Sequence, residues 1–485
     1  AGHSLSTVGV ISGTSTGVAT DTATFTVRVT DEGGLFVDRS FTTTITVAAL
    51  APFYIGASST LGPDIFDAKS LTVDMDNIES ATMYEVYSSA GSDAGAIIEI
   101  RDNTGTRVHS HRLTRTYTNS SNETVIKDMA FFDGKYVTCG FTKAGSSEAD
   151  LLLASMTNTP PSAATTVQFR HGNINGSGND RFDARGIIGV TAGYGGSAQT
   201  KFFTAGDYTH GDRNVFVHWA NGSLSPLNSK VWREQTPNVN YSGFAAMCYT
   251  TGGQYPYVLT KGWNGERSLY LMNTTAGIQM SAKISVGNDL EAMCGDNATS
   301  DIYVGGDSGR LARMNAVFGQ QGSGYEIQTN GVNDVIKGLR VVGSTLYALA
   351  TGSNYCVLIA LNKTTLAILW SKKFSSVSFM NAGTGEPLGN DPNNISLSFR
   401  GSTTQAIQLN IPLDGSGLAS SYTNGTQTVT IAAATSTLSG SYNLLSGQSI
   451  YGFMTNVANN AGMSTTGTNV YTQSNVALTD TYIAI

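Results

Sequence analysis

The segments Phe244-Ala-Ala-Met-Cys248 and Leu290-Glu-Ala-Met-Cys294 are near copies of each other, and they point to the fold. Each is a short apolar stretch with small side chains, and each opens a unit of roughly 50 residues that recurs along the chain. Self-similarity at a regular period is typical of repeat architectures. Four more stretches of this kind are Leu71-Thr-Val-Asp-Met75, Val125-Ile-Lys-Asp-Met-Ala130, Gly186-Ile-Ile-Gly-Val190 and Val335-Ile-Lys-Gly-Leu339.

Three further strand patterns follow the first one in the same order. The second strand is aromatic, around Tyr84, Tyr136, Phe203, Tyr257, Tyr303, Tyr347 and Leu397. The third is aliphatic, as in Ala96–Ile100, Leu151–Ala154, Val215–Trp219, Ser268–Met272, Arg310–Met314, Val357–Leu361 and Ala406–Ile411. The fourth is more polar, as in Val108–Arg112, Val167–Arg170, Val231–Arg233, Met280–Lys283, Tyr325–Gln328 and Ile368–Lys372.

Four short strands in each repeat predict an all-β fold, a β-propeller of about seven blades over residues 53–425. The seventh repeat has no clear fourth strand of its own. The isolated stretch Phe53-Tyr-Ile-Gly-Ala57 has the missing pattern, so we expect it to pair with the last repeat and close the ring.

Two regions flank the predicted propeller. Residues 22–47 contain two alternating arms, Ala23–Val29 and Phe41–Val47, around the turn Thr30-Asp-Glu-Gly-Gly34, and this predicts a hairpin. The stretch FTVRVTDEGGLFVDRSFTTTITV resembles the closing hairpin of bacterial Ig-like or cadherin-like modules, which implies that residues 1–50 are the C-terminal part of such a module. Residues 426–485 are rich in Ser, Thr and Asn, and they predict either a small β module or an extended arm that adds strands to a neighbour.

The composition excludes some classes of function. Only 13% of the 485 residues are charged, the net charge is −7, and the chain has no run of basic residues, so binding of nucleic acid is not expected. The chain also has no long apolar run, so membrane insertion is not expected. The four cysteines have no paired spacing, and we interpret them as small buried apolar side chains.

Several polar motifs were considered as sites, and none is assigned a catalytic, metal or cofactor role. Gly306-Asp-Ser-Gly309 is interpreted as a turn between the second and third strands, because the chain lacks a matching His and Asp. The histidines lack a zinc spacing, whether grouped as His210, Asp212 and His218 or as His109 and His111.

Two groups of oxygen-bearing residues were also considered. The loop Asn173-Ile-Asn-Gly-Ser-Gly-Asn-Asp180, with Asp183 after it, lacks the acidic positions of a calcium loop. Asp74 and Asp76 lie close together in the sequence, as a pair of glycosidase carboxylates might if the fold brought others to them.

The repeats resemble those of virion structural and tail-fibre proteins of marine phages. The resemblance is carried by Tyr136-Val-Thr-Cys-Gly140 with Leu151-Leu-Leu-Ala154, by Trp370, and above all by Ile407-Gln-Leu-Asn-Ile-Pro-Leu-Asp-Gly-Ser416 with Tyr422 after it. It implies a non-enzymatic virion protein, a tail fibre or surface appendage involved in host attachment. Its expected partners are other virion proteins or copies of itself, and a glycan or protein of the host surface. Two alternatives stay open, a secreted bacterial adhesin and a glycan hydrolase on a propeller.

Overall fold

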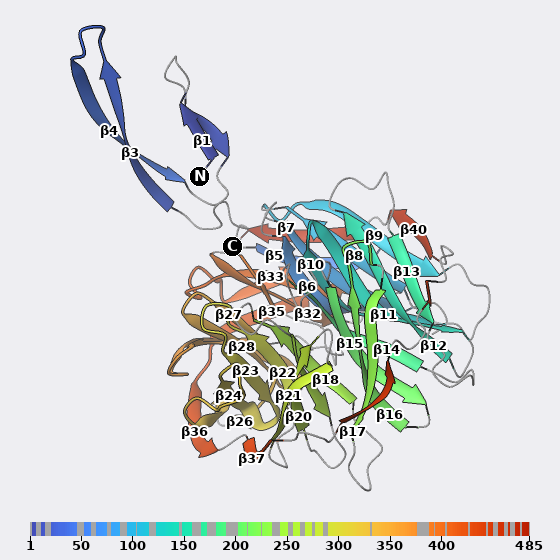
Figure 1. The fold of residues 1–485 in the computed structure, drawn as a ribbon. Helices are drawn as coiled ribbons and strands as arrows, with labels where there is room; N and C mark the ends of the chain where they lie inside the picture. Colours follow the sequence, from blue (N-terminus) through green and yellow to red (C-terminus); the bar gives the residue numbers. More distant parts are fainter. Residues whose placement is uncertain are drawn as a thin grey trace.

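The computed structural model consists almost entirely of antiparallel β-strands, and these form a ring of sheets (Figure 1). Each sheet is a blade of a β-propeller. The structure describes residues 2–5, 11–14, 21–45, 53–59, 65–74, 79–87, 95–102, 104–115, 123–144, 148–157, 166–171, 181–190, 202–210, 212–224, 226–234, 243–250, 256–261, 267–273, 277–284, 290–329, 332–375, 388–391, 393–402, 405–424, 427–442, 445–449, 454–459, 464–465, 471–475 and 478–484.

Within those residues, seven four-stranded units follow one another, and we number them as blades 1 to 7. Blade 1 is β6 (Ile65–Asp74), β7 (Glu79–Tyr87), β8 (Gly95–Arg101) and β9 (Arg107–Arg115). Blade 2 is β10 (Glu123–Phe132), β11 (Lys135–Ala144), β12 (Glu148–Thr157) and β13 (Thr166–His171). Blade 3 is β14 (Arg181–Gly189), β15 (Phe202–His210), β16 (Asp212–Ala220) and β17 (Pro226–Glu234). Blade 4 is β18 (Gly243–Tyr249), β19 (Pro256–Lys261), β20 (Arg267–Asn273) and β21 (Gly277–Ile284). Blade 5 is β22 (Leu290–Gly295), β23 (Ile302–Gly306), β24 (Arg310–Met314) and β25 (Gly324–Thr329), and β26 (Val332–Asn333) pairs with β25. Blade 6 is β27 (Val335–Val342), β28 (Thr345–Thr351), β29 (Tyr355–Asn362) and β30 (Ile368–Ser375).

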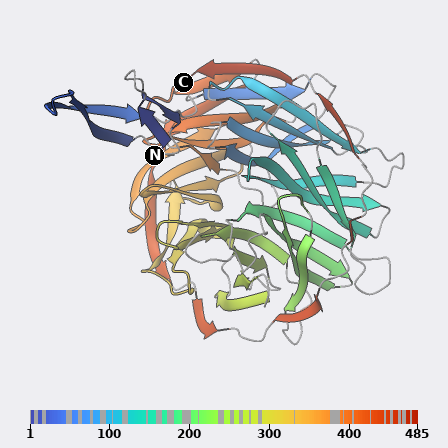
Figure 2. The same cartoon turned by 45° about the horizontal axis from the view of Figure 1, so that its top comes forward.

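Blade 7 combines the two ends of the repeat region. Its strands are β31 (Leu388–Asn390), β32 (Asn394–Ser402), β33 (Gln405–Pro412) and β5 (Phe53–Ser59). Phe53 lies opposite Asn410 and Ala57 opposite Ala406, so the predicted pairing of Phe53–Ala57 with the last repeat is confirmed. The inner strand of each blade contacts that of the next, and β31 and β32 contact β6 of blade 1, which closes the ring seen in Figure 2.

The four sequence patterns fall on the strand positions for which they were predicted. The aliphatic third strands are buried on both faces, because each blade is packed between two others. In β12, for example, Leu152 and Ala154 join the core shared with blade 1, whereas Leu151 and Leu153 join the core shared with blade 3. This two-sided burial explains why third strands such as Leu151–Ala154 and Val357–Leu361 are continuous apolar runs and do not alternate.

The second-strand tyrosines of blades 4, 5 and 6 link each blade to the next. The hydroxyls of Tyr257, Tyr303 and Tyr347 donate to the carbonyl oxygens of Ala316, Lys363 and Leu413 at 3.3, 3.0 and 2.8 Å. Each acceptor is next to a turn residue whose side-chain oxygen accepts backbone N–H groups, namely Asn315, Asn362 and Asp414. The aromatic pattern therefore reports contacts between blades as well as burial.

The C-terminal part of the chain runs once around the outside of the ring, and we call residues 427–484 the belt (Figure 2). The belt begins with β35 (Gln427–Ala433), which also pairs with β34 (Ser421–Asn424). Its strands add antiparallel to the outermost strands of blades 6, 5, 4, 3, 2, 1 and 7 in that order, as β35, β36 (Ser436–Tyr442), β37 (Leu445–Ser449), β38 (Met454–Asn459), β39 (Ser464–Thr465), β40 (Tyr471–Asn475) and β41 (Leu478–Ala484). The predicted module or arm is thus an arm, and its strands pair with this chain's own blades.

Two hairpins precede the ring. β1 (Gly2–Leu5) pairs with β2 (Ile11–Thr14), and β3 (Asp21–Thr30) pairs with β4 (Phe36–Ile45). The hairpin of β3 and β4 projects from the ring in Figure 1. Its second strand begins at Phe36, five residues before the predicted arm, because a tight turn ends there: the Asp31 carboxylate accepts the Leu35 N–H at 2.8 Å, and Gly34 has a φ of 83°.

Candidate functional site: the ring centre and the projecting hairpin

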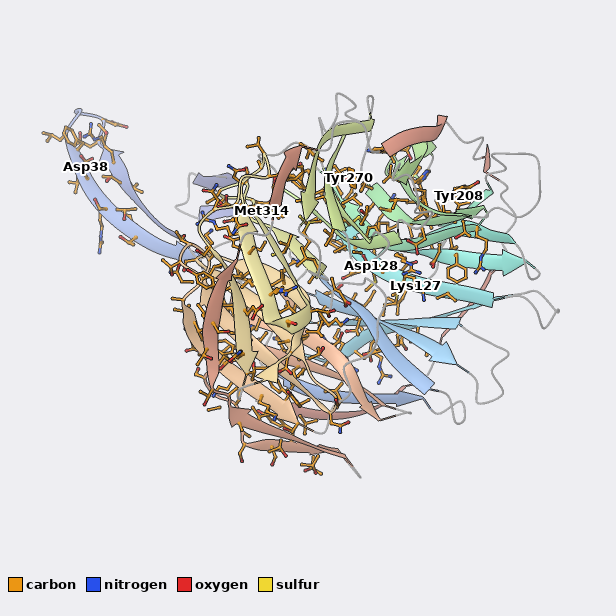
Figure 3. All side chains as sticks on the ribbon, turned by 90° about the horizontal axis from the view of Figure 1, so that it is seen from below. Asp38, Lys127, Asp128, Tyr208, Tyr270 and Met314 are labelled. Carbon is orange, nitrogen blue, oxygen red and sulfur yellow. The ribbon has the colours of Figure 1, made fainter. Side chains whose placement is uncertain are left out.

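The inner strands share a bulge that was not foreseen from the sequence. In six blades of the described chain, the register of the first strand shifts at an equivalent position. The residues at the shifts are Lys69, Lys127, Arg185, Ala245, Glu291 and Lys337. A bulge leaves one residue outside the ladder and re-aims its side chain, which is how charged residues are accommodated in these buried strands. In Figure 3, Lys127 and Asp128 lie on the side of their sheet toward the middle of the ring.

Most of the described charges at these bulges are compensated. Arg185 is 3.0 Å from a carboxylate oxygen of Asp183 and 3.0 Å from one of Asp207. Lys337 of blade 6 forms an ion pair with Glu291 of blade 5. These groups bind each other, so the arrangement favours a structural role at the centre of the ring over the binding of a ligand.

Buried carboxylates join the blades in the same region. Asp128 of blade 2 accepts the Ile187 N–H of blade 3 at 3.0 Å. One blade further, Asp207 accepts the Phe244 N–H of blade 4 at 2.5 Å. Each carboxylate satisfies a backbone donor of the neighbouring inner strand, so the acid side chains hold the ring together.

The structure separates the three residues considered as a metal site on β15 and β16. His210 and Asp212 lie opposite each other at one end of the two strands. His218 lies opposite Thr204 and is fully buried, six residues along β16 from Asp212, which corresponds to about 20 Å. These residues are therefore not brought together.

The other polar motifs form no shared site in the described residues. His109 and His111 lie on β9, between β8 and the belt strand β40. Asp183 pairs with Arg185, Asp74 ends β6, and residues 173–180 and 76 lie outside the described residues. Among the His, Cys, Asp and Glu side chains that the structure describes, no group of three or more is placed to hold a metal.

Two smaller predictions are confirmed. Residues 307–309 form a short 3-10 turn between β23 and β24, the second and third strands of blade 5, so the Gly306-Asp-Ser-Gly309 motif is a turn. All four cysteines are buried, and none of them is in a disulfide. Burial raises the pKa of the Cys139 and Cys356 thiols, which keeps them protonated and unreactive.

The segment that carries the phage resemblance forms the corner at which the chain leaves blade 7 for the belt. Asp414 accepts the Ser416 N–H at 2.9 Å, and Gly415 has a φ of 68° against the Trp370 indole. The Tyr422 hydroxyl accepts the Ala419 N–H at 3.0 Å. The Asp, Gly, Ser and Tyr of this motif therefore take part in a sharp turn.

One face of the projecting hairpin is a ladder of paired polar side chains. Across β3 and β4, the hydroxyls of Thr24 and Thr42 are 3.1 Å apart, and those of Thr26 and Ser40 are also 3.1 Å apart. Arg28 donates two hydrogen bonds of 2.7 Å to Asp38, which projects with the hairpin in Figure 3. This ion pair holds the pKa of Asp38 below its ordinary value.

The opposite face of the same hairpin is apolar and exposed. Val29 lies opposite Val37, and their side chains are 68% and 71% exposed. Phe41 is on the same face, and Leu35 in the adjoining turn is 75% exposed. Five of the eight exposed large apolar side chains in the described chain are on this hairpin. The fifth, Phe36, lies on the polar face, where the guanidinium carbon of Arg28 is 3.8 Å from the centre of its ring. An exposed patch of this kind marks an interaction surface.

Comparison with known proteins assigns this chain to no family. Neither a family model nor a curated protein sequence matches the chain. Similar solved structures are the Dos1 propeller (TM-score 0.46, 10% identity, 74% of this chain and 95% of that one), Raptor from Chaetomium thermophilum (0.44, 9%, 74% and 29%) and the β-propeller domain of Cps50 (Swd1) from Myceliophteria thermophila (0.42, 10%, 67% and 96%). At such low identity these names say nothing about what this protein binds.

Proposed function

We propose that this protein is a structural protein of a phage particle, a tail fibre or another surface appendage that takes part in attachment to the host. The observation that carries the proposal is the contrast between the ring and the hairpin. Belt strands cover the outer strands of the blades, while the hairpin keeps a large apolar face uncovered. A self-contained ring with one exposed apolar element suits a component that is built into a larger assembly.

The belt supports this role on physical grounds. An uncovered outer strand presents a row of free N–H and C=O groups, which promotes pairing between molecules. Appendage proteins stand close together in many copies, so free strand edges would lead to uncontrolled association. The belt strand becomes the new edge of its sheet, and in blades 1 to 4 this edge is shorter: β40, β39, β38 and β37 have 5, 2, 6 and 5 residues, whereas the strands that they cover, β9, β13, β17 and β21, have 9, 6, 9 and 8. Short edge strands limit such pairing.

The resemblance to virion proteins gives the proposal its direction. The proposed partners are other virion proteins or copies of this chain on the hairpin side, and a glycan or protein of the host surface on the ring. We assign no catalytic step and no cofactor. Within the described residues, no helix is long and apolar enough to cross a bilayer.

The decisive experiment is peptide mass spectrometry of virus particles purified on a density gradient. The chain is expected in the particle fraction, at a constant ratio to the major capsid protein across the gradient. The matched control is the cell-envelope and secreted fraction of the same culture. Finding the chain only in that control fraction would refute the virion proposal and favour a secreted adhesin.

A further inference from the structure

We infer that the hairpin of β3 and β4 docks onto an open β-sheet of a different protein chain, covering that sheet's apolar face and pairing with its edge. This deepens the proposed function, on which it rests only in taking the partner to be another component of the same assembly. The inference stands on three properties of the hairpin: its two unlike faces, its free edges and the limited area of its apolar face.

The two faces of the hairpin differ in polarity and in how their side chains are accommodated. On the polar face, the paired hydroxyls and the Arg28–Asp38 ion pair satisfy one another across the strands. On the other face, Val29, Val37 and Phe41 are left in water beside the equally exposed Leu35. A sheet that is polar on one face and apolar on the other is the building block of a β-sandwich, in which the apolar face is covered by a second sheet.

The edges of the hairpin lack some of the usual protections against pairing. Within the described chain, β3 and β4 pair only with each other, over ten residues and without a register shift. Neither strand contains Pro or Lys, the residues that commonly block edge pairing. The belt strands at the outer edges of the blades have at most seven residues, whereas β3 and β4 have ten each, so the hairpin presents a longer edge.

The size of the apolar face argues against a second copy of this chain as the occupant. Taking about 200 Å² for a large apolar side chain, the four exposed residues of this face and its turn, Val29, Leu35, Val37 and Phe41, offer on the order of 500 Å². A stable interface needs roughly 800 Å² from each partner, so two such faces packed on each other would fall short. A partner that covers the face and also forms a backbone ladder with one edge makes up the difference.

The charges of the hairpin add a requirement for the partner. Arg39 lies on the apolar face, opposite Val27, and its guanidinium carbon is 5.6 Å from the centre of the Phe41 ring. Covering this face would bury the Arg39 charge, which must then find an acceptor. The partner sheet is therefore expected to present a carboxylate or free carbonyl oxygens among its apolar residues.

The test is site-specific photo-crosslinking in the full-length protein, in whichever particle or surface fraction contains it. Benzoylphenylalanine replaces Val37 on the apolar face, and in a matched control it replaces Thr26 on the polar face. The inference expects an adduct that joins position 37 to a β-strand of another protein. The yield from position 26 is expected to be about tenfold lower, which corresponds to a preference of about 1.4 kcal/mol for contact through the apolar face. Equal yields from both positions, or none from position 37, would contradict it.

Two measurements on the same material identify the occupant. An adduct from position 37 that maps onto the hairpin of a second copy would overturn the inference in favour of self-association. In light scattering, the isolated protein is expected to be a monomer, and a dimer that Val37→Asp abolishes would also overturn it. The crosslink is read in whichever fraction contains the chain. Absence of the chain from virus particles therefore refutes the virion proposal, while the adducts formed in the other fraction still decide this inference.

Discussion

A buried amide clamps the seam at which the ring closes, and it offers the sharpest test of the fold. Gln408 of blade 7 donates from Nε2 to the Ser80 hydroxyl at 3.0 Å and accepts from the Thr82 hydroxyl at 2.9 Å, both in blade 1. All three side chains are buried, and Gln408 and Ser80 are 328 positions apart in the sequence. The hydrogen bonds therefore link the two ends of the repeat region.

We predict that Gln408→Met strongly destabilises the ring. The substitution nearly conserves volume, so a cavity contributes little, but it removes two hydrogen bonds and leaves the hydroxyls of Ser80 and Thr82 without their partner. Each buried hydroxyl left unsatisfied costs about 1–3 kcal/mol, so the free energy of unfolding should fall by about 2–5 kcal/mol.

The triple variant Ser80→Ala, Thr82→Val and Gln408→Met separates the clamp from general packing. Replacing all the partners by apolar groups of similar shape is close to neutral, so its stability should return to within about 1 kcal/mol of the original protein. Urea unfolding followed by tryptophan fluorescence measures both changes, provided that the slope with urea stays constant. A triple variant no more stable than Gln408→Met would refute the reasoning.

Three further predictions follow from the belt and the tyrosines. Deleting residues 436–485 uncovers the outer strands of six blades, so light scattering should show that the shortened protein self-associates. The control is Val429→Thr in the retained β35, which should lower the melting temperature without causing association. Tyr303→Phe should cost about 1 kcal/mol in urea unfolding, and Tyr347→Phe less, because the Trp370 indole also donates to the Leu413 carbonyl at 3.2 Å; equal losses would contradict this. Burial raises the pKa of Tyr257 and Tyr347 from 10.0 to about 12. The stability that this shift contributes is therefore complete below pH 10 and is lost as the pH rises to 12. When both residues are replaced by Phe, the melting temperature should fall less steeply between pH 10 and pH 12.

Much of the ring could be predicted because propeller strands carry local patterns. Burial on both faces favours a continuous apolar run, as in Leu151–Ala154, and the second-strand tyrosines of blades 4, 5 and 6 each donate a hydrogen bond to the next blade. The closing strand Phe53–Ala57 was recognisable because one repeat lacked a fourth strand. In each case the physical requirement acts within a few residues or at a regular period.

The candidate site was less visible in the sequence. The hairpin was predicted, but the start of β4 at Phe36 depends on the turn that Asp31 stabilises, and the exposure of the apolar face depends on what else packs nearby. Lys127 and Lys337 are already equivalent in the sequence, in the repeated Val-Ile-Lys, whereas Arg185 becomes equivalent to them only once the bulges align the strands. A search for charged residues at equal distances from each repeat start could have found them.

The sequence by itself determined the all-β class, the order of four strands in each repeat, the closing role of Phe53–Ala57 and the burial of the cysteines, since all of these follow from local composition and period. Only the tertiary structure decided where residues 427–484 go. Belt strands pair through backbone hydrogen bonds with outer strands that are far away in the sequence. Backbone pairing of this kind places few requirements on the side chains. A polar segment rich in Ser and Thr can therefore pair with every blade of the ring, although its own sequence does not indicate which strands it pairs with.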